Sequence, residues 1–487
     1  MNPAYIPPEE KHGAFWRKSA QYTLTAKLQE TPNLNKAKNG ILFIGDGMSQ
    51  ATIMAARTFY GQMERGLGEE TTYCIDAQVA DSACTATSYL TGVKTKYGVI
   101  GLDGNVTRGS CFPQLHEPNW SHSIGQCALD HGLDVGVVTT TRVTHASPAG
   151  LYAHSSERLW ESDANMPDEC LSLGCKDIAY QLMMENPGKQ FKVIMGGGRK
   201  EFLPNTTLSS SSSGSRLDGV DLTEAWHAHK LQLNASHLYV TDRLELMKAQ
   251  NQPTLEEMVE VAIKMLSRSP KGYFLFVEGG RIDHAHHDSL AHLALDETVE
   301  YSKAIKKAKS LTNEEDTLIV VSADHAHTMT VSGYPSRGND ILSTVDTAKG
   351  MDGLPYTTIS YANGKASSIV AGGRVDLSRA TTTTYSYLII FKGILIYCIF
   401  YIPGDLGYSY PSLVPIDSET HGGEDVAVYA IGPYQHLFTA SYEQNVLPHL
   451  MAYAMCLGED KHKNCNSNNY RVWKSSAGSI RPIKHIY

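Results

Sequence analysis

One short stretch of the sequence carries carboxylate and imidazole side chains at a spacing that suits metal coordination. Residues 278–288 read EGGRIDHAHHD, and Asp283 and His287 are four positions apart in it. If a helical turn begins at Asp283, the two side chains lie on one face and can bind the same ion. The alternative for this stretch taken alone is a solvated loop that happens to contain three histidines.

The residues around this stretch predict the elements that position it. Residues 273–277 read YFLFV, an apolar run with the length and composition of a buried strand. The two glycines after Glu278 permit a tight turn at the end of that strand. A helix-like segment at 290–309 follows. Glu278 and Asp283 are therefore expected where a strand passes into helix.

Side chains that can bind metals also flank four other predicted strands. These are residues 39–44 with Asp46, 135–140 with His145 and Ser147, 317–321 with Asp324 and His325, and 426–431 with His421. In α/β folds, functional groups gather at the carboxyl ends of the strands. The sequence therefore predicts an α/β protein with a central, mostly parallel sheet flanked by helices on both faces, and one metal cluster at an edge of that sheet.

Two of the candidate residues have a structural alternative. Asp46 could cap the helix predicted at residues 51–60 instead of binding a metal. Ser82 stands where another helix would start, and a hydroxyl there could be either a nucleophile or an N-cap. The sequence around it, DSACTAT, has no G-x-S-x-G motif, which argues against a hydrolase triad.

Composition narrows the class of protein. The chain has 487 residues, 42% of them hydrophobic and 19% charged, which is typical of soluble globular proteins. A net charge of -9 provides no basic surface, so nucleic acid recognition is not expected. An acidic protein with an anionic substrate needs local positive charge, and bound cations could supply it.

Cysteines and sequons bear on the cellular compartment. Nine cysteines are too few for a disulfide-dense scaffold. Four sequons together favour a secretory route. They begin at Asn105, Asn119, Asn205 and Asn234. Residues 1–16 contain no apolar signal region and residues 475–487 no apolar tail, so neither a signal peptide nor a lipid anchor is expected in this sequence.

The motifs around the candidate residues resemble those of the animal alkaline phosphatases. The matching segments are FIGDGMS, DSACTATSYLTGVKT, TRVTHASPAGLYAH, FLFVEGGRIDHAHH, ADHAH and ETHGGEDVAVYA, in the family's order and at similar spacings. They cover residues 38–334 and 416–457. The resemblance implies one domain over residues 1–487, with its core at 38–334 and 415–460. It also implies a smaller surface insertion at 335–414, called the crown.

The resemblance implies a site with two zinc ions and one magnesium ion. The ligands of the first zinc would be Asp283, His287 and His421. Those of the second would be Asp46, Ser82, Asp324 and His325. Those of magnesium would be Asp46, Ser147 and Glu278. Residues expected beside these ligands are His145, His284 and His327, and the match to the phosphate-binding arginine is Arg158. Imidazole and carboxylate suit zinc, whereas hydroxyl and carboxylate suit magnesium.

The activity implied is hydrolysis of phosphate monoesters at alkaline pH, with Ser82 as nucleophile and a phosphoserine intermediate. Three divalent ions carry six positive charges, and the four ligand carboxylates with ionised Ser82 return five. Arg158 adds a positive charge on a planar group that fits two phosphate oxygens. The excess of about two positive charges matches a phosphomonoester dianion. The sequence does not identify the physiological ester.

Two alternatives belong to other classes. One is a related metal-dependent phosphodiesterase or sulfatase, against which Ser82, Arg158 and the complete ligand set argue. The other is a non-catalytic glycoprotein of the same fold. The expected partners are phosphomonoester substrates, inorganic phosphate and a second copy in a homodimer. An extracellular or cell-surface location is expected, with membrane attachment only through an anchor that this sequence does not encode.

Two segments depart from the pattern of the alkaline phosphatase family. Residues 385–402 read YSYLIIFKGILIYCIFYI, where the relatives have a polar part of the crown. A membrane span here is rejected, because it would separate His421 from Asp283. The segment is interpreted as translated non-coding sequence or, if native, as buried in the crown or between subunits. The segment 230–253 is shorter than in the relatives, and no calcium site is predicted there.

By resemblance, two disulfides are expected, Cys111 with Cys175 and Cys456 with Cys465. Cys84 is expected to be a small packing residue rather than a catalyst.

Overall fold

The structure is a computed structural model. It describes residues 31–60, 69–71, 73–206, 213–232, 252–366, 369–370, 373–374, 377, 385–391, 394–400, 403–457 and 465. The sequon at Asn234 and most of the segment 230–253 lie outside the described residues, so the expectations for them stay predictions.

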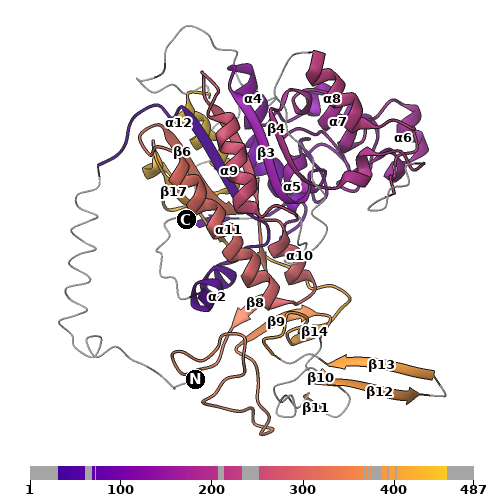
Figure 1. Cartoon of the computed structure of the whole chain (residues 1–487), viewed down its shortest axis with the longest axis vertical. Helices are drawn as coiled ribbons and strands as arrows, with labels where there is room; N and C mark the ends of the chain where they lie inside the picture. The colour runs from indigo at the N-terminus through magenta and orange to yellow at the C-terminus, as the bar shows by residue number, and fades with distance from the viewer. Residues whose placement is uncertain are drawn as a thin grey trace.

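A six-stranded sheet forms the centre of the molecule (Figure 1). Its order is β17-β6-β1-β5-β3-β4, and every pair is parallel except β17 with β6. In chain order the strands are β1 (Asn39–Gly45), β3 (Asp134–Arg142), β4 (Val193–Gly197), β5 (Tyr273–Glu278), β6 (Thr317–Ala323) and β17 (Tyr429–Ile431). Strands covered on both faces need continuous apolar runs, which is the pattern of β1 and β5. The predicted α/β class and mostly parallel sheet are confirmed.

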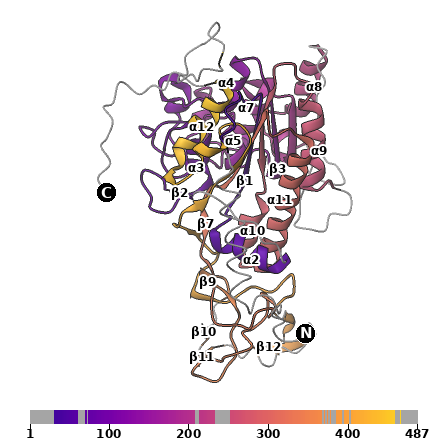
Figure 2. The ribbon, with the colours of Figure 1, turned by 90° about the vertical axis from the view of Figure 1, so that its left-hand side faces the viewer.

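Helices cover both faces of this sheet (Figure 2). One layer consists of α9 (Leu255–Leu266), α10 (Arg281–His287) and α11 (Ala291–Leu311). The other contains α3 (Ser82–Thr91), α4 (Ile124–Asp130), α7 (Ile178–Met184) and α12 (Leu447–Met455). Because successive side chains of a strand point to opposite faces, Ile41 and Phe43 of β1 pack in the first layer, and Leu42 and Ile44 in the second.

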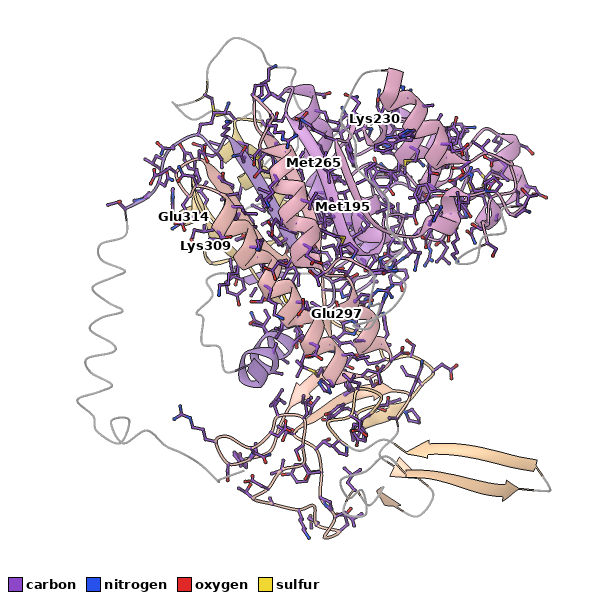
Figure 3. The ribbon with its side chains drawn as sticks, in the orientation of Figure 1. Met195, Lys230, Met265, Glu297, Lys309 and Glu314 are labelled. Carbon is purple, nitrogen blue, oxygen red and sulfur yellow. A yellow bond between two sulfur atoms is a disulfide. The ribbon has the colours of Figure 1, made fainter. Side chains whose placement is uncertain are left out.

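The first layer shows how sequence determines the packing of one helix. Helix α9 begins with a capping box between Thr254 and Glu257, and its apolar residues then recur at helical spacing towards the sheet. Met265 of α9 and Met195 of β4 belong to this layer and are labelled in Figure 3.

Smaller elements complete the main body. The helices among them are α2 (Gln50–Tyr60), α5 (Ala146–Ala149), α6 (Asp168–Ser172) and α8 (Leu222–Gln232). The short strands are β2 (Glu69–Thr71), β7 (Ala326–His327), β15 (His421–Gly422), β16 (Val426–Ala427) and β18 (Ser441–Glu443). The single strand predicted at 426–431 is wrong in detail. It is two strands, because β16 pairs with β2 whereas β17 pairs with the central sheet.

The described residues of 329–366 and 403–415 form a separate layer beside α2 and α11 (Figure 1). Three of its strands make one sheet, namely β8 (Met329–Val331), β9 (Ile359–Gly364) and β14 (Ser412–Pro415). Buried Ile359, Tyr361 and Tyr410 attach this sheet to α2 and α11. Two further strands, β10 (Ile369–Val370) and β11 (Gly373–Arg374), pair with each other. The division of the chain into core and crown stays a prediction.

The apolar segment at 385–402 contains an antiparallel hairpin. Strands β12 (Tyr385–Phe391) and β13 (Ile394–Phe400) pair from Tyr385 with Phe400 to Phe391 with Ile394. They form a two-stranded sheet of their own, and Figure 1 shows it extending away from the other strands. The expectation that a second subunit or the rest of the crown covers it stays a prediction. Among the described helices, none is long and apolar enough to cross a membrane.

The cysteine pairing corrects one expectation. Cys111 is bonded to Cys170 of α6, not to Cys175. All three residues lie in one apolar cluster, and the Cys175 thiol contacts the Cys111 carbonyl oxygen at 3.4 Å. Proximity therefore allows either partner, and motif matching alone could not decide between them. The second expected bond, Cys456–Cys465, is present.

A third bond joins Cys74 to Cys84, so Cys84 is more than the packing residue that was expected. Cys127 and Cys175 are free thiols among the described cysteines, and both are buried.

Candidate metal centre

Three parallel strands end at the same level and bring acids from distant parts of the sequence together. Ile44 of β1 is in register with Glu278 of β5 and with Ser322 of β6, so Asp46, Glu278 and Asp324 all lie at the carboxyl edge. This edge faces α2 and α10, on the side of the insertion (Figure 1). All three carboxylates are fully buried.

The turn after β1 needs glycine to make this approach possible. Gly47 has a φ of +68°, and a Cβ there would overlap the His327 imidazole. The hydroxyl of Ser49 accepts from the backbone N–H of Thr52 at 3.0 Å, which caps α2. The alternative in which Asp46 caps that helix is therefore wrong, and the Asp46 carboxylate is available to the site.

Asp283, His287 and His421 come together at one point. Asp283 and His287 share a face of α10, as the four-residue spacing predicts, and β15 carries His421 to them by pairing with β7. The two imidazole Nε2 atoms are 3.2 Å apart, and they lie 3.4 and 3.3 Å from Asp283 Oδ1. Ligands bound to a tetrahedral zinc at its usual bond lengths would be about 3.3 Å from one another. The spacing fits the first predicted zinc set.

A second group of four atoms has the same dimensions. His325 Nε2 lies 3.1 Å from Asp324 Oδ2, 3.5 Å from Asp46 Oδ1 and 3.2 Å from Ser82 Oγ. Ser82 Oγ is 3.5 Å from Asp46 Oδ1. These separations again approximate the edges of a zinc tetrahedron, and they place the predicted nucleophile at one of its corners.

Backbone contacts orient the three imidazoles of these sets. The Nδ1 atoms of His421, His287 and His325 lie 2.7, 2.5 and 3.3 Å from the carbonyl oxygens of Ala80, Glu419 and Ala326. A carbonyl accepts only, so Nδ1 carries the proton and Nε2 is left with a lone pair for a cation. This arrangement is usual for histidines that bind metals.

Buried oxygens without partners mark the third predicted set. Asp46 Oδ2, Ser147 Oγ and Glu278 Oε1 have no hydrogen bond within the described part of the chain, and Asp324 Oδ2 has none either. A buried polar atom left unpaired costs free energy, so such a cluster calls for a ligand. The first three atoms belong to the three residues predicted to bind magnesium, and carboxylate and hydroxyl oxygens are the donors that magnesium prefers.

The pKa values of the buried carboxylates also favour a site that holds cations. Burial, together with repulsion from Asp324, Asp283 and Glu278, raises the pKa of Asp46 well above its usual range. Burial raises the pKa of Glu278 to about 7, although the hydroxyls of Thr139 and Thr141 oppose that shift. A bound divalent cation would relieve both causes, because it offsets the repulsion and replaces the lost solvation.

Asp283 behaves differently from the other acids. Burial disfavours its ionised form, but the neighbouring His287, His327 and His421 outweigh burial and hold its pKa well below the usual range. Burial, with His421 nearby, keeps the pKa of His325 low, so this imidazole is neutral and can act as a ligand. The site thus combines ionised or ionisable carboxylates with neutral imidazoles, the forms that zinc requires.

Arg158 lies at the entrance to this cluster. Its Nη1 donates to Asp81 Oδ2 at 2.9 Å, its Nη2 contacts His145 Nε2 at 3.1 Å, and 18% of its side chain is exposed. Burial and the adjacent Arg158 lower the pKa of His145 well below its usual value, so it is neutral. His145 groups with Asp46 and Glu278, as predicted for a residue beside magnesium.

His327 and His284, the other two residues expected beside the metal ligands, differ in their distance from those ligands. His327 Nε2 contacts Asp283 Oδ1 at 2.8 Å, so it adjoins a predicted ligand directly. His284 contacts Arg281 Nη1 at 3.0 Å and packs edge-on against His145, so it is one residue further out.

Three supporting groups were not recognised from the sequence. Asp81 caps α3 through the Cys84 N–H and also holds Arg158, so the N-cap is Asp81 and not Ser82. Buried Glu419 lies 2.5 Å from His327 Nδ1 and accepts from Thr328. Thr139 and Thr141 donate to Glu278. Asp81 directly precedes Ser82, and Glu419 stands two residues before His421, so their closeness in sequence to candidate residues was the available signal.

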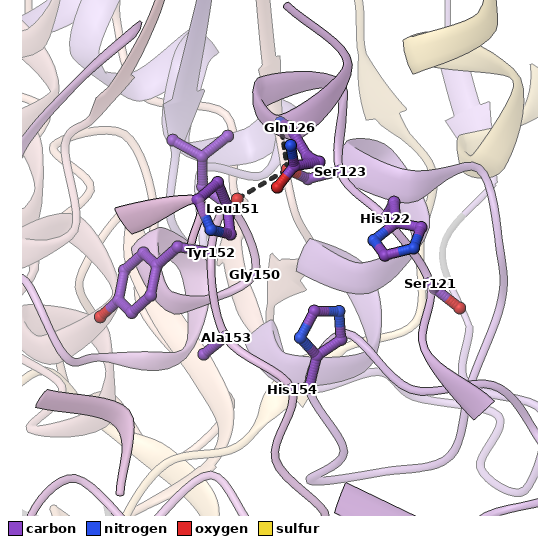
Figure 4. Close-up of a pocket in the computed structure, with 10 residues that line it drawn as sticks. Ser121, His122, Ser123, Gln126, Gly150, Leu151, Tyr152, Ala153 and His154 are labelled. Carbon is purple, nitrogen blue, oxygen red and sulfur yellow. Dashed lines mark hydrogen bonds between the residues drawn. The ribbon is translucent and has the colours of Figure 1, made fainter. Parts of the chain in front are cut away.

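A small pocket lies elsewhere in the protein, lined by residues 121–123, 126, 150–154 and 187 (Figure 4). His154 stacks on Trp120, and burial lowers its pKa to about 3. None of the residues lining the pocket is a carboxylate or one of the predicted metal ligands.

A mostly parallel sheet with acids and imidazoles gathered at its carboxyl edge defines an α/β protein with a candidate metal site. The family described as alkaline phosphatase matches residues 37–253 and 249–457. The chain belongs to the alkaline phosphatase family, whose members hydrolyse phosphate esters and depend on metal ions.

Relatives from several animals cover nearly the whole chain. The tissue-nonspecific alkaline phosphatase of Rattus norvegicus is 42% identical, over 98% of this chain and 94% of the relative. The membrane-bound alkaline phosphatase of Bombyx mori is 40% identical, over 93% of this chain and 87% of the relative.

Solved structures share the fold at lower identity. The alkaline phosphatase of the Antarctic bacterium TAB5 has a TM-score of 0.57 and 19% identity, over 87% of this chain and 99% of that chain. The Thermus thermophilus alkaline phosphatase has a TM-score of 0.58 and 20% identity, over 93% of this chain and 96% of that chain.

Proposed function

We propose that this protein hydrolyses phosphate monoesters at alkaline pH through a phosphoserine intermediate on Ser82, with two zinc ions and one magnesium ion. The observation that carries the proposal is the geometry of the nitrogen and oxygen atoms that would bind the three ions. Two sets of atoms have the edge lengths of a zinc tetrahedron, and the three oxygens of the predicted magnesium set are buried without partners.

The ligand residues fit the proposed ions. Asp283, His287 and His421 would hold one zinc, with Asp46, Ser82, Asp324 and His325 around the other. Asp46, Ser147 and Glu278 would hold magnesium. When bound, these ions would supply the positive charge that binds a phosphate dianion and the Lewis acidity that favours ionised oxygen nucleophiles at moderate pH.

Ser82 is positioned to act as nucleophile. It starts α3, so its hydroxyl stands at the positive end of a helix of ten residues whose first turn contains no acid. Its Oγ is 3.2 Å from His325 Nε2 and 3.5 Å from Asp46 Oδ1, and its side chain is buried apart from a 1% exposed fraction. Attack by this oxygen on phosphorus forms the Ser82–phosphate bond and releases the alcohol of the ester.

Arg158 would orient the phosphoryl group. Its side chain is 18% exposed, Nη1 donates one hydrogen to Asp81 and Nη2 contacts His145, and each of these nitrogens carries a second hydrogen that could bind an anion. A planar fork binds two phosphate oxygens at once and fixes their rotation. Water then attacks phosphorus, breaks the Ser82–phosphate bond and returns the serine hydroxyl with inorganic phosphate.

The partners and location follow from the family and are part of the proposal. Phosphomonoesters would be the substrates, inorganic phosphate the product, and a homodimer the assembly. An extracellular or cell-surface site is proposed, since the relative from Bombyx mori is described as membrane-bound.

The test compares three chromogenic esters with the same leaving group, measured on purified protein after metal analysis. The expected result is about two zinc and one magnesium per chain, and rapid turnover of p-nitrophenyl phosphate that a chelator abolishes. Bis(p-nitrophenyl) phosphate and p-nitrophenyl sulfate should react far more slowly. Preference for the diester or the sulfate would assign the site to another class. Acid quench during turnover should label the peptide containing Ser82 with phosphate.

A further inference from the structure

The disulfide between Cys74 and Cys84 closes a short ring around the nucleophile. The two Cα atoms are 5.7 Å apart with a sequence separation of 10, and the two residues are only 2% and 1% exposed. The residues between them include Ala80, Asp81 and Ser82. Each of these three consecutive residues contacts a different part of the metal centre.

The contacts made by the ring span the site. The Ala80 carbonyl lies 2.7 Å from His421 Nδ1, which orients a predicted zinc ligand. Asp81 Oδ2 accepts from Arg158 Nη1 at 2.9 Å, which holds the predicted phosphate-binding side chain. Ser82 Oγ approaches His325 Nε2 at 3.2 Å. A shift of the ring would therefore displace a metal ligand, the arginine and the nucleophile together.

Between Cys74 and Ala80 the side chains of this ring are exposed or half-buried. Its apolar cluster consists of the two cysteines with Ala80 and the half-buried Ala77. Ile75 and Val79 are 47% and 37% exposed, and the tip is held to residues 95–97 by two hydrogen bonds, from Ile75 N to Thr95 O and from Tyr97 N to Asp76 Oδ1. The two bonded cysteines are two of the three buried residues in this cluster, and the third, Ala80, is small.

The two cysteines also adjoin the carboxylate of Asp81, which holds Arg158. Cys84 N–H donates to Asp81 Oδ1 at 3.2 Å, and Cys74 Sγ is 3.7 Å from the same oxygen. The Gly98 N–H donates to this carboxylate from the opposite side at 3.1 Å. Asp81 is thus enclosed by the disulfide and one backbone turn, with its second oxygen directed to Arg158.

We propose that the Cys74–Cys84 disulfide is a positioning device for the reaction. It holds Ala80, Asp81 and Ser82 in the register that keeps His421, Arg158 and the nucleophilic oxygen aligned. This inference rests on the proposed phosphomonoesterase function. The disulfide does not touch substrate, so its effect should appear in phosphate affinity and zinc retention and not only in stability.

The test removes the bond in the full-length metal-loaded protein, with the variants Cys74→Ser/Cys84→Ser and Cys74→Val/Cys84→Ala. The second pair keeps an apolar filling in case the first fails to fold. The matched control is Cys456→Ser/Cys465→Ser, which removes a disulfide of nearly equal separation, 9 against 10, whose ring carries no residue of the site.

The measurements are KM and kcat for p-nitrophenyl phosphate, the inhibition constant of inorganic phosphate, the rate of zinc loss to a chelator, and the melting temperature. Loss of the Cys74–Cys84 bond should raise the phosphate inhibition constant and the rate of zinc loss about tenfold each, because removing outer partners of ligands commonly costs that much. The control should lower the melting temperature and leave both quantities unchanged.

Two outcomes would overturn the inference. One is that both ring variants match the control, with altered stability but native phosphate and zinc affinities. The other is peptide mapping that finds Cys74 and Cys84 as free thiols in the native protein. Either result with an active wild-type enzyme refutes only the positioning role, whereas a wild type without phosphomonoesterase activity refutes the proposed function itself.

Discussion

At the candidate metal centre, side chains from distant parts of the chain meet at short distances, whereas the layer formed by the described residues of 329–415 also contains hydrogen bonds between residues that are close in the sequence. Ser82 and His325 are 243 positions apart and Gly47 and Asp324 are 277 apart, yet both pairs are within hydrogen-bonding distance. In the insertion, Asn339 bonds to Thr344 and Ser336 to Asp346, separations of 5 and 10.

The two regions also differ in which side chains they bury and which they expose. The metal centre buries carboxylate and hydroxyl oxygens without partners. The insertion exposes large apolar side chains, with Tyr334 at 90% and Leu413 at 65%. A cluster of unpaired buried oxygens calls for a ligand such as a cation, whereas single exposed apolar side chains are ordinary on a protein surface. The difference teaches that the candidate site is assembled by the topology of the central sheet, because its acids follow strands that end at one edge.

The largest effect is expected at the nucleophile. Ser82→Ala should lower kcat for p-nitrophenyl phosphate by at least about a thousandfold, because no covalent intermediate can form. Stopped assays at saturating substrate measure this, with zinc content as the control for an intact site. A variant with wild-type turnover and full metal content would rule out the phosphoserine step.

Metal-free protein should reveal the strain among the buried carboxylates. The pKa of Glu278 is about 7 in the folded chain and 4.5 as the ordinary value, so the folded state binds the extra proton between these pH values. The free energy of unfolding should therefore fall as pH rises from 4.5 to 7, by about 3 kcal/mol from this residue.

Denaturant titrations of metal-free wild type and Glu278→Gln measure that contribution together with the effect of the Glu278 charge on the pKa of Asp46. The wild type should lose stability relative to the variant over this range and regain it when magnesium is added. If the free energy of unfolding changed with pH in the same way in both proteins, the pKa of Glu278 would not be raised in the metal-free protein.

A smaller effect is expected at the phosphate-binding side chain. Arg158→Ala should raise KM and the inhibition constant of inorganic phosphate roughly ten- to hundredfold, because one charge-assisted bidentate contact is lost. Turnover at saturating substrate should persist. Steady-state kinetics with phosphate as inhibitor decide this, and complete inactivity with retained zinc would mean that the guanidinium takes a larger part than charge alone.

The smallest effect is expected in the insertion. Replacing residues 381–402 by a short Gly-Ser linker should leave kcat and zinc content within about twofold, because the reaction does not use this segment. Light scattering should show less aggregation once the apolar residues are removed. A loss of zinc after this replacement would show that residues 381–402 help to position His421, which follows them in the chain.

The sequence was informative where a short-range rule sets the geometry. The i, i+4 spacing of Asp283 and His287 requires only one helical turn, and α10 provides it. The acids after β1, β5 and β6 meet because parallel strands in register end at a common edge. Apolar runs predicted those strands to within a few residues.

Sequence reasoning failed where two partners compete in space. Cys170 and Cys175 both lie beside Cys111, and only the folded chain shows which one bonds. Glu419 pairs with His327 because β15 folds back onto β7, a contact across 92 positions that no local pattern encodes. Asp81 was passed over beside Ser82, although its carboxylate both caps α3 and holds Arg158.

Zinc-edge anomalous diffraction from crystals of the metal-loaded protein tests most directly whether distant side chains share cations. Two peaks are expected, one among Asp283, His287 and His421 and the other among Asp46, Ser82, Asp324 and His325. Zinc bound at other residues, with these two sets vacant in an active enzyme, would contradict the proposed centre.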